Sequence, residues 1–287
     1  MSSQEWQLVY RTIRMVDRSV SRTNRRPLFP DTLIVAMYFW SVAHDRPLCW
    51  AALRTNYSSI FRPRCLPSRS QFCRRIKTER CQLILRNVFH RLANVNHGSP
   101  SPITLMDGRG LRVQSHSTDP DATRGYASGG FGRGYKMHAL ANEYGRFLDV
   151  RVTSMNVAEK TVARELIDEN RPAGLLLADQ GYESGPLYEY AAERRVVMMT
   201  PLFKNAGSGH RPQSKARMFA KRLWKTFGAD LYQRRTAIER FFGQLSGFGG
   251  GLAPLPPWVR RLDRVERWVR TKVTLYHARL TVKENAA

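Results

Sequence analysis

The spacing of apolar residues along the chain changes between residues 95 and 103, from a helical pattern to one in which short apolar strands alternate with helices. Residues 1–95 are therefore expected to be all-helical. Asp31 is expected to cap one helix, and Ser68 to cap a later one in which Phe72 and Ile76 lie four residues apart. This region is predicted to form a separate N-terminal domain.

The helix that begins after Ser68 is basic, and a short helix after Pro47 precedes it. A short helix, a turn and a basic helix are typical of the helix-turn-helix motif, whose second helix enters the major groove of DNA. A helical bundle with a solvated, arginine-rich face is the alternative. In the first interpretation, the residues expected to contact DNA are Arg69, Arg74, Arg75 and Lys77.

Residues 96–102 are rich in Asn, Ser, Pro and Gly and are expected to be a linker. Residues 103–250 then predict an α/β fold, with a mixed sheet flanked by helices. The expected strands are 103–106, 111–114, 135–141, 146–153, 175–178 and 196–200, of which the third and fourth form a hairpin.

Residues 117–134 are expected to be a long loop. A helix is expected to start at Asn156, in a capping box with Glu159. The basic residues of this region that are expected to contact DNA are Arg124, Arg133 and Lys136.

The clearest helical pattern in the chain lies near residues 231–245. Its apolar face is expected to pack on the sheet and contains Leu231, Ile238, Phe241, Phe242 and Leu245. A neighbouring stripe carries Tyr232, Arg235 and Glu239. Taken alone, Arg235 and Glu239 would be a solvent-exposed salt bridge between residues four apart.

Two further segments are strongly basic. Residues 203–228 are expected to be an insertion that faces DNA through Lys221 and Arg222, with Trp224 either stacked on a displaced base or packed in the protein. Residues 251–287 predict a basic amphipathic helix with apolar positions at coiled-coil spacing. That helix could pack on the core, pair with a second protomer or follow a phosphate backbone.

Composition narrows the possible partners. The 287 residues carry 47 Lys and Arg against 23 Asp and Glu, a net charge of +24. Such an excess favours a polyanion, and therefore nucleic acid. The four cysteines form no Cys-x-x-Cys pair, which argues against structural zinc and favours a reducing compartment. No secretory signal or membrane-spanning run is expected, so the protein is predicted to be cytoplasmic.

Asp107 and Asp179 each follow a short apolar run and are expected at strand ends, where a sheet holds side chains in place. Either residue alone would be read as a cap or a turn residue. Together with Glu239, however, they could form a carboxylate cluster that holds paired divalent metal ions beside a phosphate. In a chain this basic, such a cluster predicts cutting and joining of DNA.

The stripe Tyr232-x2-Arg235-x3-Glu239 resembles part of the signature of bacterial DDE transposases of the IS4/IS5 type. The segment Leu-Ala-Asp-Gln-Gly-Tyr182 is similar to the block around that family's second Asp, and Met106-Asp-Gly-Arg to its first. Two intervening segments, Gly134-Tyr-Lys-Met-His and Thr153-Ser-Met-Asn-Val, also resemble the family, and the blocks occur in the same order. The resemblance covers residues 28–250.

The resemblance implies an RNase H-like core in which Asp107, Asp179 and Glu239 bind two Mg²⁺ ions, with Mn²⁺ as a substitute. It implies that Tyr232 and Arg235 contact a phosphate near the cut. The chain departs from the family at Ser246, where a lysine is usual, so that lysine's phosphate contact is in doubt. Lys221, Arg222 or Arg240 could replace it.

The expected function is that of an insertion-sequence transposase that binds terminal inverted repeats and catalyses Mg²⁺-dependent cleavage and strand transfer. The expected partners are double-stranded DNA, as element ends and target, and a second copy of the chain in the synaptic complex. No membrane partner is expected, and the expected location is the bacterial cytoplasm. The alternatives are a non-catalytic DNA-binding protein derived from a transposase and a Mg²⁺-dependent nuclease without joining activity.

Overall fold

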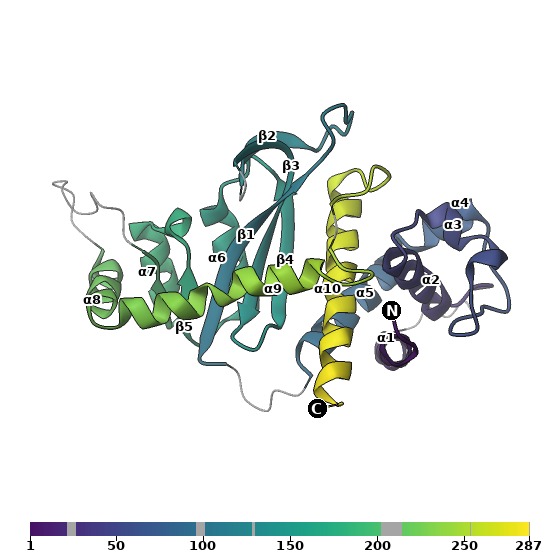
Figure 1. Cartoon of the computed structure of the whole chain (residues 1–287), viewed down its shortest axis with the longest axis horizontal. Coiled ribbons are helices and arrows are strands. Elements are labelled where there is room, and N and C mark those ends of the chain that lie inside the picture. The colour runs from purple at the N-terminus through teal and green to yellow at the C-terminus, as the bar shows by residue number, and fades with distance from the viewer. Residues whose placement is uncertain (22–26, 96–100, 128–129, 202–213, 253, 287) are drawn as a thin grey trace. The chain divides into compact units, whose positions relative to one another are not determined.

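The computed structural model describes residues 1–21, 27–95, 101–127, 130–201, 214–252 and 254–286 (Figure 1). The chain forms two compact units. The helical unit comprises Met1–Asn96, Leu245–Val259 and Asp263–Ala287, and the sheet unit comprises His97–Gln244 and Arg260–Leu262. Most of the expected linker 96–102 and the first part of the expected basic insertion 203–228 lie outside the described residues. In the described part of the chain, no helix is long and apolar enough to cross a membrane.

Every element described in residues 1–95 is a helix, as the pattern predicts. The elements are α1 (Ser3–Ser19), α2 (Asp31–Ala43), α3 (Leu48–Ala51), the 3-10 turn η1 (Arg54–Asn56), α4 (Arg69–Arg75) and α5 (Glu79–Ala93). Ser68 caps α4 in a capping box with Gln71, as expected. Phe72 and Ile76 are both buried.

Asp31 has a different role from the one predicted. It is the first residue of α2, and Pro30 occupies the cap position without a side-chain hydrogen bond. The Asp31 carboxylate pairs instead with Arg75 and Arg80. Burial alone would raise the pKa of Asp31, but hydrogen bonds from Arg75 and Arg80 hold it below its usual range. Arg75 is therefore engaged inside the helical unit and is not a free cation on α4.

The C-terminal helix α10 (Leu262–Glu284) begins later than expected and is not amphipathic in the predicted sense. Every residue from Thr271 to Ala278 is buried, the polar residues as well as the apolar ones. Lys272 is fully buried, and its ammonium pairs with Asp45 beyond the end of α2. His277 packs on Phe89 of α5, with ring centroids 5.4 Å apart. α10 is thus a central helix of its unit.

The sheet unit contains the mixed sheet that the sequence predicts. Its strands are β1 (Ile103–Arg112), β2 (Thr123–Ala127), β3 (Gly130–Asn142), β4 (Phe147–Ser154), β5 (Gly174–Ala178) and β6 (Val196–Met199). The order is β2-β3-β1-β5-β6, and β4 pairs with β3. β3 is antiparallel to β1, β2 and β4, and β5 is parallel to β1 and β6.

Two strand boundaries differ from prediction. The segments expected as separate strands at 103–106 and 111–114 belong to one strand, β1, because its pairing with β3 continues through Gly108 and Gly110. Asp107 consequently lies within β1 and not at its end. The expected loop 117–134 contains β2 and the first residues of β3, which pair with each other.

Gly134 allows β3 to change pairing partners. It pairs with Thr123 of β2 and with Arg112 of β1. Its φ angle is 155°, and a Cβ at this position would come within 2.2 Å of the Leu111 carbonyl oxygen. Only glycine fits this backbone conformation and close approach.

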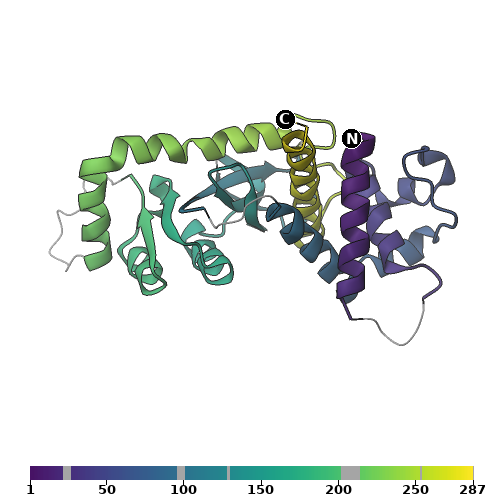
Figure 2. The ribbon, with the colours of Figure 1, turned by 90° about the horizontal axis from the view of Figure 1, so that it is seen from below.

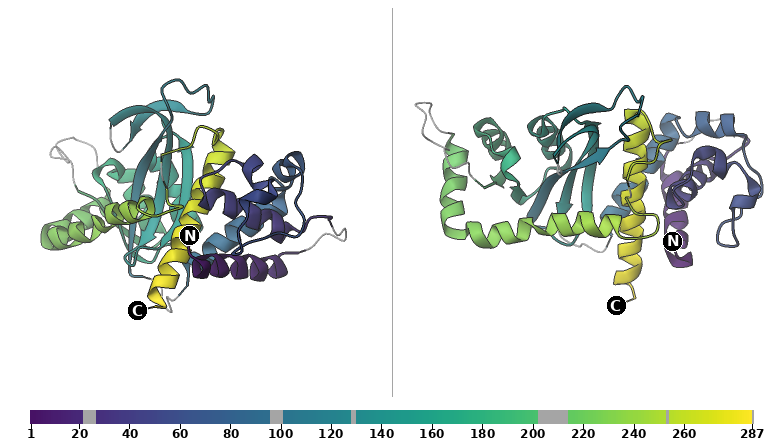
Figure 3. Two further views of the ribbon diagram at one scale, coloured as in Figure 1. Left: turned by 45° about the vertical axis from the view of Figure 1, so that its right-hand side comes forward. Right: turned by 45° about the horizontal axis from the view of Figure 1, so that its top comes forward.

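Helices cover both faces of the sheet (Figures 2 and 3). α6 (Glu159–Asn170) and α7 (Gly185–Glu193) lie on one face, and α9 (Ala237–Ser246) on the other. The cap of α6 is Ala158, without a side-chain hydrogen bond, so the capping box expected at Asn156 does not form. Asn156 instead accepts a hydrogen bond of 2.9 Å from the Thr123 hydroxyl.

The helix predicted near residues 231–245 is interrupted at Thr236, which separates α8 (Lys215–Arg235) from α9. Ile238, Phe241, Phe242 and Leu245 are buried along α9, as the apolar pattern predicts. The face predicted to pack on the sheet therefore belongs mainly to α9, while Tyr232 and Arg235 lie at the end of α8 and Glu239 in the first turn of α9.

Candidate active site

The three candidate catalytic acids line one open pocket of the sheet unit, the acid pocket. Asp107 comes from β1, Asp179 from the turn after β5, and Glu239 from α9. Tyr232 and Arg235 of α8 line the same pocket. One strand, the turn after another strand and two helices thus bring together all five predicted residues, the two aspartates and the Tyr-Arg-Glu stripe.

Asp107 is the most enclosed of the three acids, with 9% of its surface exposed. Its Oδ1 atom accepts a 2.8 Å hydrogen bond from the Gly108 amide. Burial raises the pKa of Asp107 to about 6, although the positive charge of Arg235 opposes this shift. A divalent cation would favour the ionised form of this carboxylate, because positive charge offsets the effect of burial.

Asp179 directly follows β5, as the sequence predicted, and caps the 3-10 turn η2 (Gln180–Tyr182). Its Oδ1 atom accepts a 2.9 Å hydrogen bond from the Gly181 amide. A Cβ at Gly181 would lie 3.1 Å from Asp179 Oδ1 and 3.1 Å from Glu159 Oε2. The carboxylates of Asp179 and Glu159 therefore face the same point, and a glycine keeps that point open.

Arg235 links two of the acids. Its guanidinium lies 3.1 Å from Asp107 Oδ2 and 2.8 Å from Glu239 Oε1. The salt bridge expected between residues four apart does form, and it extends across the pocket to β1. Burial alone would lower the pKa of Arg235, but the charges of Asp107, Asp179 and Glu239 more than offset burial and raise it.

Glu159 is a fourth acid in the pocket that the sequence did not single out as a site residue. It begins α6, and its Oε1 atom lies 3.1 Å from the Lys136 ammonium. Lys136, expected to contact DNA, is 5% exposed and presents no open cationic surface. The sequence indicated Glu159 only as the capping-box partner of Asn156. That prediction concerned the start of a helix and did not indicate that the carboxylate points into the acid pocket.

The other residues expected to contact DNA lie in varied surroundings. Arg133 donates hydrogen bonds to the carbonyl oxygens of Ser117, Asp119 and Ala122, which hold the segment before β2. Trp224 is half-buried, and its ring lies 5.9 Å from that of Tyr232. Arg74, Arg124 and Arg222 are exposed, and Lys221 is half-buried.

A pair of exposed aromatic residues stands beside the acid pocket. Tyr126 of β2 is 73% exposed and Phe131 of β3 is 58% exposed. They pair across the two strands with ring centroids 5.1 Å apart, and Tyr126 lines the pocket. Both residues lie in the segment 117–134 that was expected to be a loop, so no pattern in the sequence predicted this pair.

The donor set of the acid pocket suits a hard divalent cation, because all four acids offer carboxylate oxygens. Among the described residues, no three His, Cys, Asp or Glu side chains lie close enough to hold a metal ion as they stand. Arg235 occupies the space between Asp107 and Glu239, so shared coordination by these two acids requires its guanidinium to move. All four cysteines are free thiols.

Comparison with known proteins gives one positive result. Residues 98–276 match the family model described as "Transposase DDE domain", which is more than half of the chain. No curated protein and no solved structure matches the chain.

Proposed function

Because the chain belongs to the transposase DDE domain family, we propose that it is an insertion-sequence transposase of the IS4/IS5 type that binds its element's terminal inverted repeats. We further propose that it cleaves the element ends and joins them to target DNA. The observation that carries this proposal is the acid pocket, in which Asp107, Asp179 and Glu239 surround the buried Arg235.

Asp107, Asp179 and Glu239 are proposed to hold two Mg²⁺ ions, or Mn²⁺ in their place, and Glu159 is positioned to assist them. Bound metal would supply Lewis-acid stabilisation of the attacking and leaving oxygens. Tyr232 and Arg235 are proposed to hold the phosphate beside the cut. The guanidinium presents a planar fork of N–H donors that matches two phosphate oxygens.

In the proposed cleavage step, a water oxygen forms a bond to phosphorus and the bond to the 3′ oxygen breaks. The 3′ oxygen takes up a proton and leaves a free hydroxyl at the element end. In the joining step, that hydroxyl attacks a target phosphate and displaces the 3′ oxygen of the target strand. Both steps are displacements at phosphorus, so one pocket serves both. The mixed sheet, with antiparallel and parallel pairs, supports an RNase H-like core.

Residues 1–95 are proposed to recognise the terminal repeats, with Arg69, Arg74 and Lys77 near the DNA. The active complex is proposed to hold two copies of the chain, one for each element end. The net charge of +24 supports a DNA partner because Lys and Arg side chains can replace the counterions of many phosphates.

Asp107→Asn, Asp179→Asn and Glu239→Gln should each lower Mg²⁺-dependent cleavage of repeat-bearing DNA by about 100-fold or more, because each removes a charge from the pocket. Binding to the repeats, measured by fluorescence anisotropy, should remain. Asp230→Asn is the matched control, since Asp230 is exposed on α8 and lies outside the acid pocket. Wild-type cleavage by Asp107→Asn would exclude this residue from the reaction.

Ser246 favours a second candidate, because a lysine is usual at that position of the family signature. A chain without that phosphate contact could cut DNA without joining it, or bind DNA without cutting it. A strand-transfer assay with pre-cut repeat ends separates the candidates. Joined products support the transposase, nicks without joined products support a nuclease, and binding alone supports a non-catalytic protein.

A further inference from the structure

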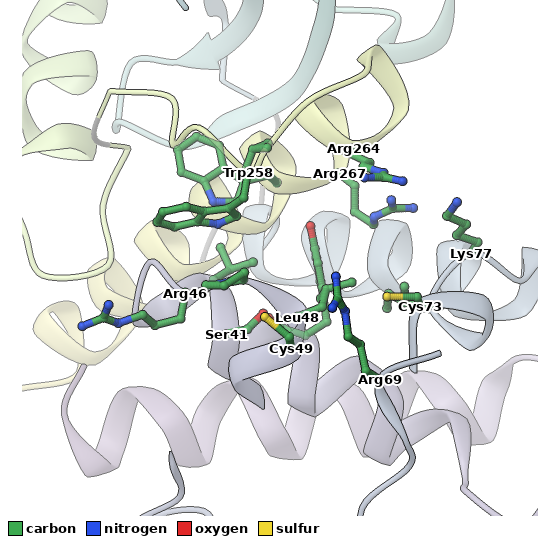
Figure 4. A pocket seen from close by; sticks show the side chains of 16 residues that line it. Ser41, Arg46, Leu48, Cys49, Arg69, Cys73, Lys77, Trp258, Arg264 and Arg267 are labelled. Atoms are coloured by element: carbon green, nitrogen blue, oxygen red, sulfur yellow. The ribbon is translucent and has the colours of Figure 1, made fainter. Parts of the chain in front are cut away.

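A second pocket lies within the helical unit, on segments that are far apart in the sequence (Figure 4). α2, α3 and α4 form part of its wall, and α10 with the residues just before it forms the rest. Its volume of 290 Å³ is at the small end of the range for ligand pockets, about 300–1,000 Å³. A pocket of this size can admit a single unit of a flexible strand and not a DNA helix.

The wall of this pocket, here named the cationic pocket, carries positive charge and no carboxylate. The five cations that line it are Arg46, Arg69, Lys77, Arg264 and Arg267. Arg267 has an acidic neighbour, Asp263, at 3.7 Å. The other four have no carboxylate partner within the residues that the structure describes. In Figure 4 the charged ends of Arg69, Lys77, Arg264 and Arg267 lie toward one side of the pocket, and that of Arg46 lies on the other side.

The cationic pocket also presents an aromatic surface. Trp258, just before α10, is 43% exposed although tryptophan is normally well buried. Buried apolar side chains, including Val42, Ile76 and Val259, form the floor beside it. A simple anion would use the arginines but leave this apolar surface in water, whereas an apolar ligand would leave the cations unpaired.

We propose that the cationic pocket binds a single nucleotide of a DNA strand. The phosphate contacts the unpaired cations, and the base or sugar packs against the Trp258 ring. A nucleotide is the unit of a nucleic acid that combines an anion with a flat aromatic group, and base–aromatic stacking is a general source of affinity for unpaired strands. The proposal rests on the proposed function in one respect only, that the partner is DNA.

The proposal gives a DNA-binding role to two segments far apart in the sequence, α4 and the region of Trp258 and α10. Arg69 and Lys77 lie in or just after α4, which the sequence predicts to contact DNA, whereas Arg264 and Trp258 belong to the C-terminal segment. A DNA strand in the pocket would therefore contact α4 and α10 together.

The test uses the full-length protein, without divalent metal, and a single-stranded oligonucleotide of about 12 nucleotides that contains 2-aminopurine. Binding of the wild-type protein should quench the emission of 2-aminopurine by stacking. Trp258→Ala should abolish the quenching and weaken binding about tenfold, while Trp258→Phe should retain most of both. Arg264→Ala should weaken binding, whereas Lys283→Ala should leave both binding and quenching unchanged.

Lys283 is the matched control because it is an exposed cation in the last turn of α10 that does not line the pocket. Circular dichroism of each variant verifies folding. The proposal is overturned if the wild-type protein gives no quenching, if Trp258→Ala quenches like the wild type, or if Lys283→Ala and Arg264→Ala weaken binding equally.

The two proposals fail separately in these measurements. Quenching that depends on Trp258, in a protein that never cuts repeat-bearing DNA, would preserve the cationic pocket and remove the proposed activity. Cleavage and joining by a protein whose quenching is independent of Trp258 would do the reverse.

Discussion

At the scale of single residues, the sheet unit buries charged and polar side chains such as Arg235 and His138. Arg235 is 6% exposed, and its guanidinium bridges Asp107 and Glu239. The pair of acids therefore approaches without the repulsion that two bare carboxylates would feel. Arg235 has two roles in this picture, as a counterion in the free protein and as a proposed phosphate ligand when DNA is bound.

His138 on β3 makes the free energy of unfolding depend on pH. It is fully buried, its Nε2 atom lies 2.9 Å from the Thr153 hydroxyl, and its Nδ1 atom is buried without a hydrogen-bond partner. Burial and the nearby charge of Lys136 lower the pKa of His138 to about 3. Between pH 6.5 and 3 the unfolded chain binds a proton that the folded chain does not, so stability is lost as the pH falls.

At pH 5 this single group should lower the free energy of unfolding by about 2 kcal/mol relative to pH 7.5. Urea unfolding at the two pH values tests the effect. His138→Gln should lose about that much less stability on acidification than the wild type, whereas His116→Gln, at an exposed position, should behave like the wild type. An identical acid response in the His138 variant would remove this explanation.

The acids differ in how far the sequence could predict them. Asp179 was predictable because an apolar run of fixed length ends before it. The position of Asp107 within β1 was not, because pairing with β3 carries the strand through two glycines that locally favour a break. Whether the Glu159 side chain reaches the acid pocket depends on where α6 packs on the sheet. The residues near Glu159 in the sequence do not determine that packing.

At the scale of elements, the change of pairing partners along β3 positions one side of the acid pocket. Up to Gly134 the strand pairs with β2, and from Gly134 onward it pairs with β1 and β4. Asp107 pairs with Ala139 in the second part, whereas Tyr126 pairs with Phe131 in the first. The exposed aromatic pair and the candidate acid Asp107 thus depend on one glycine for their relative position within the sheet unit.

Gly134→Ala should destabilise the protein by at least about 2 kcal/mol, because its Cβ would collide with the Leu111 carbonyl and the backbone would be strained. Gly243→Ala is the control. Gly243 lies on α9 with nothing within 4 Å of an added Cβ, so alanine there should stabilise the helix by about 0.5–1 kcal/mol. Thermal unfolding of the two variants in parallel measures both effects, and equal shifts of Tm would contradict the close contact at Leu111.

The apolar pattern predicted helices better than it predicted their surroundings. The prediction of the buried face of α9 is confirmed, because its four buried residues follow the helical period. For α10 the same reasoning predicted a basic amphipathic helix and gave no indication that Lys272 and His277 are buried. Both are buried because partners from elsewhere in the chain, Asp45 and Phe89, meet them.

At the scale of the whole molecule, the helical unit is assembled from both ends of the chain. The contacts that join α10 to the N-terminal part are of three kinds. Lys272 pairs with Asp45, His277 packs on Phe89, and the Arg267 guanidinium lies 5.8 Å from the Tyr38 ring centroid. The N-terminal helices therefore depend on a helix that follows the sheet unit in sequence.

A chain shortened to residues 1–261 should lose more helical circular dichroism than the 23 residues of α10 account for, because α2 and α5 lose their packing partner. Removal of residues 285–287 alone should leave the spectrum unchanged, since they follow α10. A loss that matched α10 alone would show that the N-terminal helices fold without it.

The split origin of the helical unit has a consequence during synthesis. A ribosome releases the N-terminal helices first, at roughly 5–20 residues per second, and α10 only after the whole sheet unit. The nascent chain therefore cannot complete the helical unit until α10 has been made. Products of premature termination that end before α10 should then expose the N-terminal helices and be substrates for proteolysis.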